Sequence, residues 1–216
     1  MSVSVLFTSE FEFSPAVEAE WLKALPTERQ RRIRSWPERR DRQRSLLASR
    51  LLVESLRRLG HARSALATLR YPPRSRPTLD LPLQFSLAHC AGRIACAVST
   101  HGTIGIDVEA LAGLGAHDFP LYLNPAERAW AGQCARRFYS VWTRKEAVAK
   151  AAGTTGLPAL PAVDTTPGER RAAFAGRLWR TEPVAFGSDW VGHVALADLH
   201  VPMTVEHLPE EALLLA

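Results

Sequence analysis

Two of the three lysines in this chain, Lys145 and Lys150, lie in one short segment, Trp142-Thr-Arg-Lys-Glu-Ala-Val-Ala-Lys150. The chain otherwise uses arginine as its cation, 24 times, so the lysines here indicate a need for a compact ammonium group. The segment also carries Glu146, and upstream the run Gly105-Ile-Asp-Val-Glu109 carries two more carboxylates. Oxygen ligands at this spacing suit magnesium, which binds carboxylates together with phosphate oxygens. Together the two segments predict a metal-assisted phosphate site.

Two different elements must position these side chains. Residues 103–109 alternate as a strand does, with Asp107 and Glu109 on the face opposite the aliphatic side chains. Residues 134–152 are predicted to form a long helix, on which Glu146 lies one turn from Lys150. Each motif alone has an ordinary explanation, a solvated strand end or a surface ion pair over a core tryptophan. Their joint occurrence favours a site.

The pattern along the chain predicts an α+β fold made of two similar α/β subdomains in tandem, 1–102 and 103–216. Each half consists of a strand, then helices, then further strands, although no repeat is visible in the sequence itself. Asn124-Pro125 is a helix start, with the asparagine as cap and the proline in the first turn. The expected elements of the first half are strand 3–7, helices 17–25, 27–36 and 41–59, and strands 84–87 and 94–98. Those of the second half are strand 103–109, the helices from 125 and over 134–152, and strands 173–179, 190–197 and 203–207.

Composition excludes several classes of protein. The 216 residues are 46% hydrophobic and 23% charged, as in an ordinary globular protein, and no apolar run is long enough to cross a bilayer. The first residues contain no basic segment of a secretory signal, and three cysteines without zinc-like spacing give no disulfide framework. We therefore expect a cytoplasmic protein without membrane contact.

The chain is basic, with a net charge of +5 and a sequence pI near 9.6, so its partners are expected to be acidic. Arginines concentrate between residues 28 and 44. A nucleic-acid-binding protein is the alternative that this segment suggests, but no nucleic-acid-binding motif accompanies it. We expect instead a solvated helix face from which one or two arginines reach a phosphate.

The two motifs together resemble the 4′-phosphopantetheinyl transferases, specifically the compact two-subdomain type that activates peptide and polyketide synthases. That family is marked by G-[IV]-D-x-E followed by W-x-x-K-E-[AS]-x-x-K, and both patterns are complete here. Phe85-Ser-Leu-Ala-His89 resembles the family's F-[NS]-[IL]-S-H, Arg76-Pro77 its [KR]-P, and Arg44 the arginine that opens its first long helix. The resemblance covers residues 29–157 and implies an active site between the two subdomains.

The family transfers the phosphopantetheine arm of coenzyme A to a serine of an apo acyl or peptidyl carrier protein and releases adenosine 3′,5′-bisphosphate. The resemblance implies that Asp107, Glu109 and Glu146 bind Mg2+ at the pyrophosphate. Glu146 is also the candidate base for the serine proton. Lys150 is expected to contact the pyrophosphate and to stabilise the leaving phosphate, while Lys145 either does the same or packs at the edge of the site.

The nucleotide end of coenzyme A is assigned by the same resemblance to Arg44, Arg76 and His89, with Arg29 and Arg32 as further candidates. One position departs from the family pattern, because Ala88 stands where serine is usual. The loss of that hydroxyl predicts weaker coenzyme A binding or a compensating contact. It is also the only sequence feature in favour of a non-catalytic module that binds coenzyme A or a carrier.

The resemblance further implies an acidic carrier protein as partner of a monomeric enzyme. The segment 112–137 is the expected docking surface because it follows the metal strand and mixes apolar with basic side chains. Those side chains are Phe119, Leu121, Tyr122, Arg128 and Arg136. A position in the ordinary core is the alternative for the aromatic ones.

Overall fold

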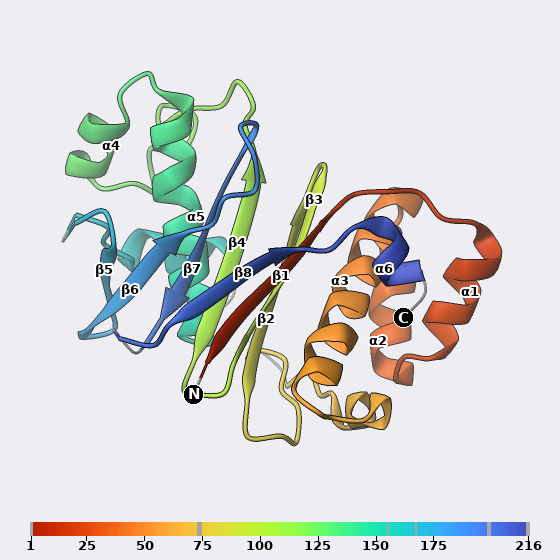
Figure 1. Cartoon of the computed structure of the whole chain (residues 1–216). Coiled ribbons are helices and arrows are strands. Elements are labelled where there is room, and N and C mark those ends of the chain that lie inside the picture. The colour runs from red at the N-terminus through yellow and green to blue at the C-terminus, as the bar shows by residue number, and fades with distance from the viewer. Residues whose placement is uncertain (1, 73–74, 155, 167, 198–199, 215–216) are drawn as a thin grey trace.

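The structure is a computed structural model that describes residues 2–72, 75–154, 156–166, 168–197 and 200–214. It contains both helices and strands, as expected of an α+β chain (Figure 1). In the first half they are β1 (Val3–Ser9), α1 (Pro15–Lys23), α2 (Thr27–Arg34), α3 (Arg39–Arg58), the 3-10 helix η1 (Arg63–Thr68), β2 (Gln84–Cys90) and β3 (Arg93–Ser99). In the second half they are β4 (Ile104–Ala110), α4 (Pro125–Ala131), α5 (Ala135–Ala151), the 3-10 helix η2 (Leu157–Ala162), β5 (Arg171–Phe174), β6 (Arg177–Pro183), β7 (Trp190–Leu196), β8 (Met203–His207) and α6 (Glu210–Leu214).

Two four-stranded sheets form the centre of the molecule. The first has the strand order β2-β3-β1-β8 and the second the order β4-β7-β6-β5. Neighbouring strands are antiparallel except β1 and β8, which run parallel with Val3 opposite Met203. The chain passes from the first sheet to the second between β3 and β4 and returns at β8.

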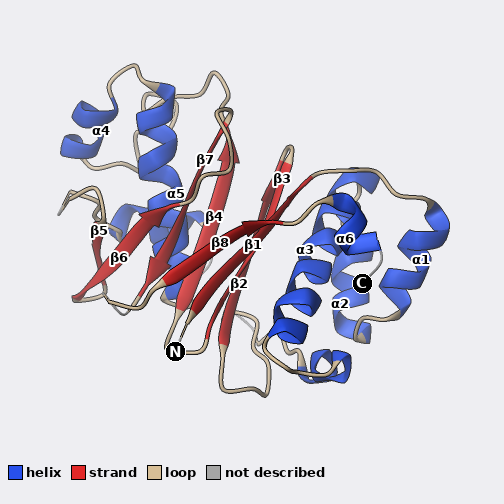
Figure 2. Ribbon diagram, in the orientation of Figure 1, coloured by secondary structure: helices blue, strands red, loops and turns tan. Residues whose placement is uncertain are grey.

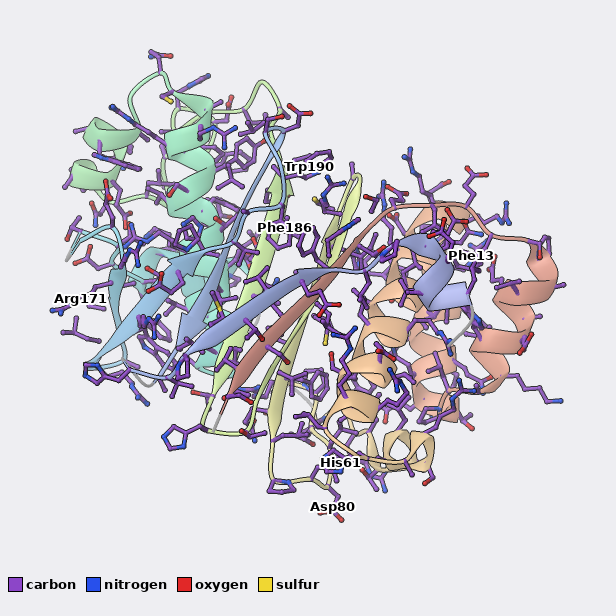
Figure 3. All side chains as sticks on the ribbon, in the orientation of Figure 1. Phe13, His61, Asp80, Arg171, Phe186 and Trp190 are labelled. Atoms are coloured by element: carbon purple, nitrogen blue, oxygen red, sulfur yellow. The ribbon has the colours of Figure 1, made fainter. Side chains whose placement is uncertain are left out.

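The layers are helices, first sheet, second sheet, helices (Figure 2). Helices α1, α2, α3 and α6 lie on one side of the strands and α4 and α5 on the other. One apolar core fills the space between α1–α3 and the first sheet, and another lies between α5 and the second sheet. A third core joins the two sheets face to face, and in it Phe186 meets Phe7 edge to face with ring centroids 5.0 Å apart (Figure 3). The two halves are therefore held together by hydrophobic burial.

Strand β4 has the two faces that its alternation predicts. Ile104, Ile106 and Val108 are buried in the core between the sheets, so Asp107 and Glu109 lie on the opposite face, where α5 packs. The alternation of apolar and acidic residues thus fixes the position of the acidic pair in the fold.

Local sequence signals explain where the neighbouring helices begin and end. The side chain of Asn124 accepts from the backbone N–H of Glu127 at 2.9 Å, and the Glu127 carboxylate accepts in return from the N–H of Asn124 at 2.8 Å. This capping box starts α4 as predicted. Helix α5 ends before Gly153, whose φ of +82° is readily adopted by glycine.

Two predictions for the second half were wrong. The segment 173–179 is not one strand but part of the hairpin β5–β6, which turns at Ala175 and Gly176 with φ of +52° and +74°. Strand β8 does not close the second subdomain, because it pairs with β1 of the first sheet. The division of the chain at residue 102 stays a prediction, with the observation that β8 lies beside the first half.

Candidate active site

A close contact between β4 and α5 creates the candidate site. Gly105 lies so near the helix that a Cβ placed on it would be 2.0 Å from the carbonyl oxygen of Ala147 and 2.6 Å from the nitrogen of Ala151. Only glycine fits there, which explains the first position of the G-I-D-V-E motif in physical terms. The approach brings the acidic face of β4 against the last turns of α5.

The buried Asp107 and the half-buried Lys150 form an ion pair at this contact. Lys150 Nζ lies 2.6 Å from Asp107 Oδ1 and also donates to the carbonyl oxygen of Ile106 at 3.2 Å. Burial raises the pKa of the Asp107 carboxyl, although the lysine opposes this rise. Burial alone would lower the pKa of Lys150, but the charges of Asp107 and Glu146 outweigh burial and raise it. The ammonium group is therefore held in its charged form between carboxylates.

Glu109 and Glu146 complete an acidic group around that lysine. Burial, reinforced by the charge of Asp107, raises the pKa of Glu109 to about 8. Burial and the charge of Asp107 likewise raise the pKa of Glu146. The charge of Asp107 thus makes ionisation of both glutamates harder, as expected when negative charges share a site without enough cation.

These carboxylates suit a divalent cation. Asp107 Oδ2 is buried without a hydrogen-bond partner, so one oxygen of the pair with Lys150 is left for another ligand. In the described part of the chain, no three histidine, cysteine or acidic side chains already lie close enough to hold a metal. The donor set is nevertheless oxygen-only and carries excess negative charge, which fits Mg2+.

A cavity of about 370 Å³ adjoins this acidic group. Its wall carries Arg29, Arg32, Arg76 and His89 from the first half of the chain and Lys150 from the second. Its volume lies within the range of small-ligand pockets, and its cations favour an anionic ligand. Lys150 both lines the cavity and pairs with Asp107, so the cavity and the acidic group form one continuous site.

Arg76 and His89, two of the residues proposed for the nucleotide end, both line this cavity. Arg76 donates to the carbonyl oxygens of Phe85 at 2.9 Å and of Ala151 at 3.4 Å, while its Nε is buried without a partner. Burial, with the charges of Lys150 and Arg29, lowers the pKa of His89 to about 4. The imidazole is therefore neutral near pH 7 and acts as a hydrogen-bonding group in a cavity whose charge comes from its neighbours.

Arg29 and Arg44 are held by the protein to different degrees. Arg29 donates to Ser49 Oγ at 3.0 Å and to the carbonyl and hydroxyl oxygens of Ser45 at 2.7 and 3.0 Å, and it still lines the cavity. Arg44 forms a two-point pair with Glu10, at 2.9 and 3.0 Å, and a further contact with Asp41. The structure does not bring Arg44 to the cavity wall.

Lys145 faces away from the cavity. Its side chain is fully buried, with Nζ 2.9 Å from Glu127 Oε2, and it donates to the carbonyl oxygens of Leu160 and Val163. These acceptors match the three donors of an ammonium group. The structure thus gives Lys145 the task of tying α5 to α4 and η2, and no contact supports the coenzyme A role predicted for it.

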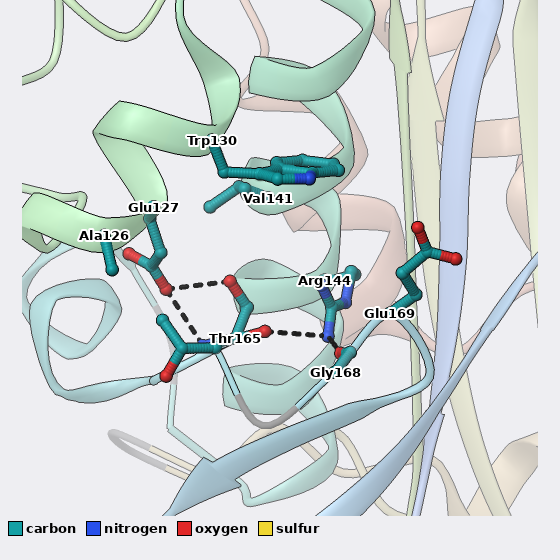
Figure 4. A pocket seen from close by; sticks show the side chains of 9 residues that line it. Ala126, Glu127, Trp130, Val141, Arg144, Thr165, Gly168 and Glu169 are labelled. Atoms are coloured by element: carbon teal, nitrogen blue, oxygen red, sulfur yellow. Dashed lines mark hydrogen bonds between the residues drawn. The ribbon is translucent and has the colours of Figure 1, made fainter.

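A second cavity, of about 280 Å³, lies between α4, α5 and the loop residues Thr165, Thr166, Gly168 and Glu169 (Figure 4). Three charged residues, Glu127, Arg144 and Glu169, line it, and the first two already have hydrogen-bond partners within the protein. Glu127 accepts from the backbone N–H and hydroxyl of Thr165 at 2.9 and 2.8 Å, and Arg144 donates to backbone carbonyl oxygens of Thr165, Gly168 and Arg171. Because these groups are engaged, this cavity offers less for an anionic ligand than the first.

Comparison with known proteins places the chain in a family. Residues 103–193, which contain β4, α5 and the acidic group, match the model of the 4′-phosphopantetheinyl transferase superfamily. This chain belongs to that superfamily. It is 28% identical over 123 residues to the 4′-phosphopantetheinyl transferase AcpT of Escherichia coli K12, covering 50% of this chain and 60% of that protein. The AcpT proteins of Salmonella typhimurium and Salmonella typhi are 30% and 31% identical over 140 residues, covering 58% of this chain and 66% of each relative. The chain thus spans about two thirds or less of the curated relatives it matches.

At Ala88 this transferase-superfamily chain differs from the family pattern, and the position of that residue bears on the predicted loss of a phosphate contact. Ala88 is 4% exposed and its side chain packs in the core between the sheets, whereas Leu87 and His89 line the cavity. The hydroxyl of Ser86, on the same face of β2, accepts from the backbone N–H of Ile106 at 3.1 Å. A hydroxyl at position 88 would therefore lie at the core between the sheets, which argues against a direct phosphate contact, although Ser86 on the same face also lines the cavity; the effect of Ala88 on coenzyme A binding stays a prediction.

Sequence reasoning missed several residues of this superfamily member's site. The spacing of Asn124 and Glu127 predicts a capping box, but no pattern in the sequence predicts the ion pair of Glu127 with Lys145. Tyr71 and Trp36 line the arginine-rich cavity from loops that carry no motif. Loop residues reach a site through tertiary packing, so a periodic pattern could not have found them.

Proposed function

We propose that this chain transfers the 4′-phosphopantetheine arm of coenzyme A to a serine of an apo acyl or peptidyl carrier protein. The observation that supports this most directly is the position of Lys150 between the arginine-lined cavity and the acidic group. Coenzyme A carries a pyrophosphate and a separate 3′-phosphate, so it needs cations in more than one place. The cavity supplies Arg29, Arg32 and Arg76 for one end, and Lys150 lies at the other.

The proposed reaction transfers one phosphoryl group, with its pantetheine arm, from coenzyme A to the serine. The serine hydroxyl oxygen forms a bond to the phosphorus that bears the pantetheine arm. The bond from that phosphorus to the bridging pyrophosphate oxygen breaks, and adenosine 3′,5′-bisphosphate leaves. Glu146 takes the serine proton, and its placement beside the reacting hydroxyl must supply much of the effect, because a carboxylate is a weak base for serine. Lys150 neutralises charge on the leaving phosphate.

Asp107, Glu109 and Glu146 are the residues that would hold Mg2+. When bound, the ion supplies positive charge to the pyrophosphate oxygens. The unpartnered Oδ2 of Asp107 supports this assignment, and so do the raised pKa values of Glu109 and Glu146, because a dication would offset both their burial and the charge of Asp107. Without such a cation Lys150 compensates only part of the charge.

The proposed partner is an acidic carrier protein, in keeping with the sequence pI near 9.6. The segment 112–137 presents Leu121 with 80% of its surface exposed, whereas Phe119 and Tyr122 pack against Trp142 with ring centroids 5.0 and 5.8 Å away. The part of the segment proposed for docking is therefore Leu121 with Arg128, which donates to the carbonyl oxygens of Pro120 and Leu123. We assign the chain to the compact type of the family that serves secondary metabolism, acting as a cytoplasmic monomer. No helix in the described residues is long and apolar enough to span a membrane.

The test is incubation of the protein with apo-carrier, coenzyme A and Mg2+, followed by intact mass measurement of the carrier. We expect a mass gain of one phosphopantetheine arm that requires Mg2+ and is lost in Glu146→Gln. Glu169→Gln is the matched control, because Glu169 is exposed and lines the second cavity. No mass gain with several carriers, or full activity in Glu146→Gln, would refute the proposal. Binding of coenzyme A without any mass gain would instead favour a non-catalytic binding module.

A further inference from the structure

An exposed tryptophan stands at the rim of the arginine-lined cavity. Trp36 lies between α2 and α3, lines the cavity and keeps 43% of its surface exposed. Its ring meets that of His89 edge on, with centroids 6.2 Å apart and planes at 75°. A ring that touches a neighbour only at an edge keeps a face for another planar group.

The backbone that carries this ring is fixed. Arg42 Nη1 donates to the carbonyl oxygens of Trp36 and Pro37 at 2.9 and 2.8 Å, and the N–H of Trp36 donates to Ile33 at 3.3 Å. The exposure of the side chain therefore does not come from a loosely held segment. A large apolar ring on a rigid turn, left in water at the mouth of a cavity, is typical of a ligand contact.

The other aromatic side chains of the cavity are already engaged. The guanidinium of Arg32 lies over the ring of Tyr71, 4.2 Å from its centroid, and Phe85 is 3% exposed within the core beneath the helices. Among the cavity residues that the structure describes, Trp36 is thus the aromatic residue with the most exposed surface. Arg29 and Arg76 lie in the same wall. Aromatic surface beside guanidinium groups is the combination that a nucleotide, a planar base with phosphates, would engage.

We propose that Trp36 stacks on the adenine base of coenzyme A and so determines the preference for a nucleotide-bearing donor. This rests on the proposed function, since it names the part of the donor that this rim binds. The phosphates lie with the arginines and Lys150, and the base covers the exposed ring. Loss of one base–aromatic stack weakens binding by roughly 5- to 150-fold.

The experiment is isothermal titration of wild type, Trp36→Ala and Trp36→Phe with coenzyme A, adenosine 3′,5′-bisphosphate and inorganic pyrophosphate. We expect Trp36→Ala to bind both nucleotides roughly 5- to 150-fold more weakly, Trp36→Phe to retain most of the affinity, and pyrophosphate binding to stay unchanged. Trp130→Ala is the matched control, because Trp130 is 41% exposed and lines the second cavity. It should bind all three ligands as wild type does.

The outcomes separate this inference from the proposed function. If Trp36→Ala binds adenosine 3′,5′-bisphosphate within twofold of wild type, or loses pyrophosphate to the same extent as nucleotide, the stacking role is refuted. If wild type binds nucleotide through Trp36 but transfers no arm to any carrier, the stacking role stands and the transferase proposal fails. If wild type binds neither nucleotide, both are refuted. Unchanged circular dichroism of each variant establishes that the fold is intact.

Discussion

Replacement of Gly105 by alanine tests whether the close approach of β4 to α5 builds the site. The added Cβ would lie 2.0 Å from the carbonyl oxygen of Ala147 and 2.6 Å from the nitrogen of Ala151, where ordinary contact begins near 3.4 Å. Both obstacles are backbone atoms, so no side-chain rotation relieves the clash. Strand and helix must separate by roughly 1 Å or more, against cores that resist such a change.

The expected cost follows from that overlap. Overpacking of a core by one methyl group destabilises by about 1–3 kcal/mol, and a backbone clash belongs at or above the upper end. We therefore expect Gly105→Ala to lower the free energy of unfolding by about 3 kcal/mol or more. The same separation stretches the contact between Asp107 and Lys150, now 2.6 Å. A displacement of about 1 Å at a reacting group can reduce the rate by about 100-fold.

Urea denaturation followed by tryptophan fluorescence measures the first effect, and the rate of carrier mass gain measures the second. Gly113→Ala is the control, since a Cβ there meets nothing within 4 Å. It should change the free energy of unfolding by less than about 0.5 kcal/mol. If Gly105→Ala were as stable and as active as Gly113→Ala, the reasoning from close approach would be refuted.

Four further substitutions test individual contacts. Glu127→Gln removes the charge that Lys145 faces in a buried pair and should cost about 3–5 kcal/mol in urea denaturation; a cost below about 1 kcal/mol would contradict the pairing. Burial lowers the pKa of His193 to about 3, so the folded state resists its protonation and stability falls as the pH drops from 6.5; His193→Asn should therefore lose about 2 kcal/mol less than wild type between pH 6 and 4. Ala88→Ser places a hydroxyl in the core between the sheets and should leave the KM for coenzyme A unchanged while lowering the Tm. A clearly lower KM would instead support a contact between the serine hydroxyl and a phosphate of coenzyme A. Lys150→Arg puts a planar fork where a compact ammonium lies 2.6 Å from Asp107, and we expect at least about a tenfold loss of activity; full activity would mean that the preference for lysine is accidental.

The sequence was sufficient for elements whose signal is local. The alternation of residues 104–109 predicted the faces of β4, and Asn124 predicted the start of α4. The prediction of one strand over 173–179 was wrong because the turn at Ala175 and Gly176 interrupts what otherwise looks like one apolar strand. Strand β8 failed because its partner, β1, lies about 200 residues away and no local pattern specifies such a pairing.

The site shows the same division. Periodicity predicted the face of each residue on its own element, whereas the joint occurrence of the two motifs and the family resemblance predicted that Asp107, Glu146 and Lys150 would come together. Lys145 was misjudged because one helix step separates it from Glu146, and that step turns its side chain toward α4 and η2. The alternation of side chains along the strand was enough to predict which face of the sheet Ala88 lies on, but the prediction for Ala88 used only the family resemblance.

The return of β8 to the first sheet has a consequence for how the chain reaches its native state. During synthesis, β1 emerges before the second sheet, yet its parallel neighbour, residues 203–207, follows only after that entire sheet has been made. Until then one edge of β1 is unpaired, and an unpaired edge is prone to wrong association. Pairings between such distant segments also slow folding, because a long loop must close before they form. We therefore expect the two halves to fold as one late, cooperative unit rather than one after the other from the ribosome.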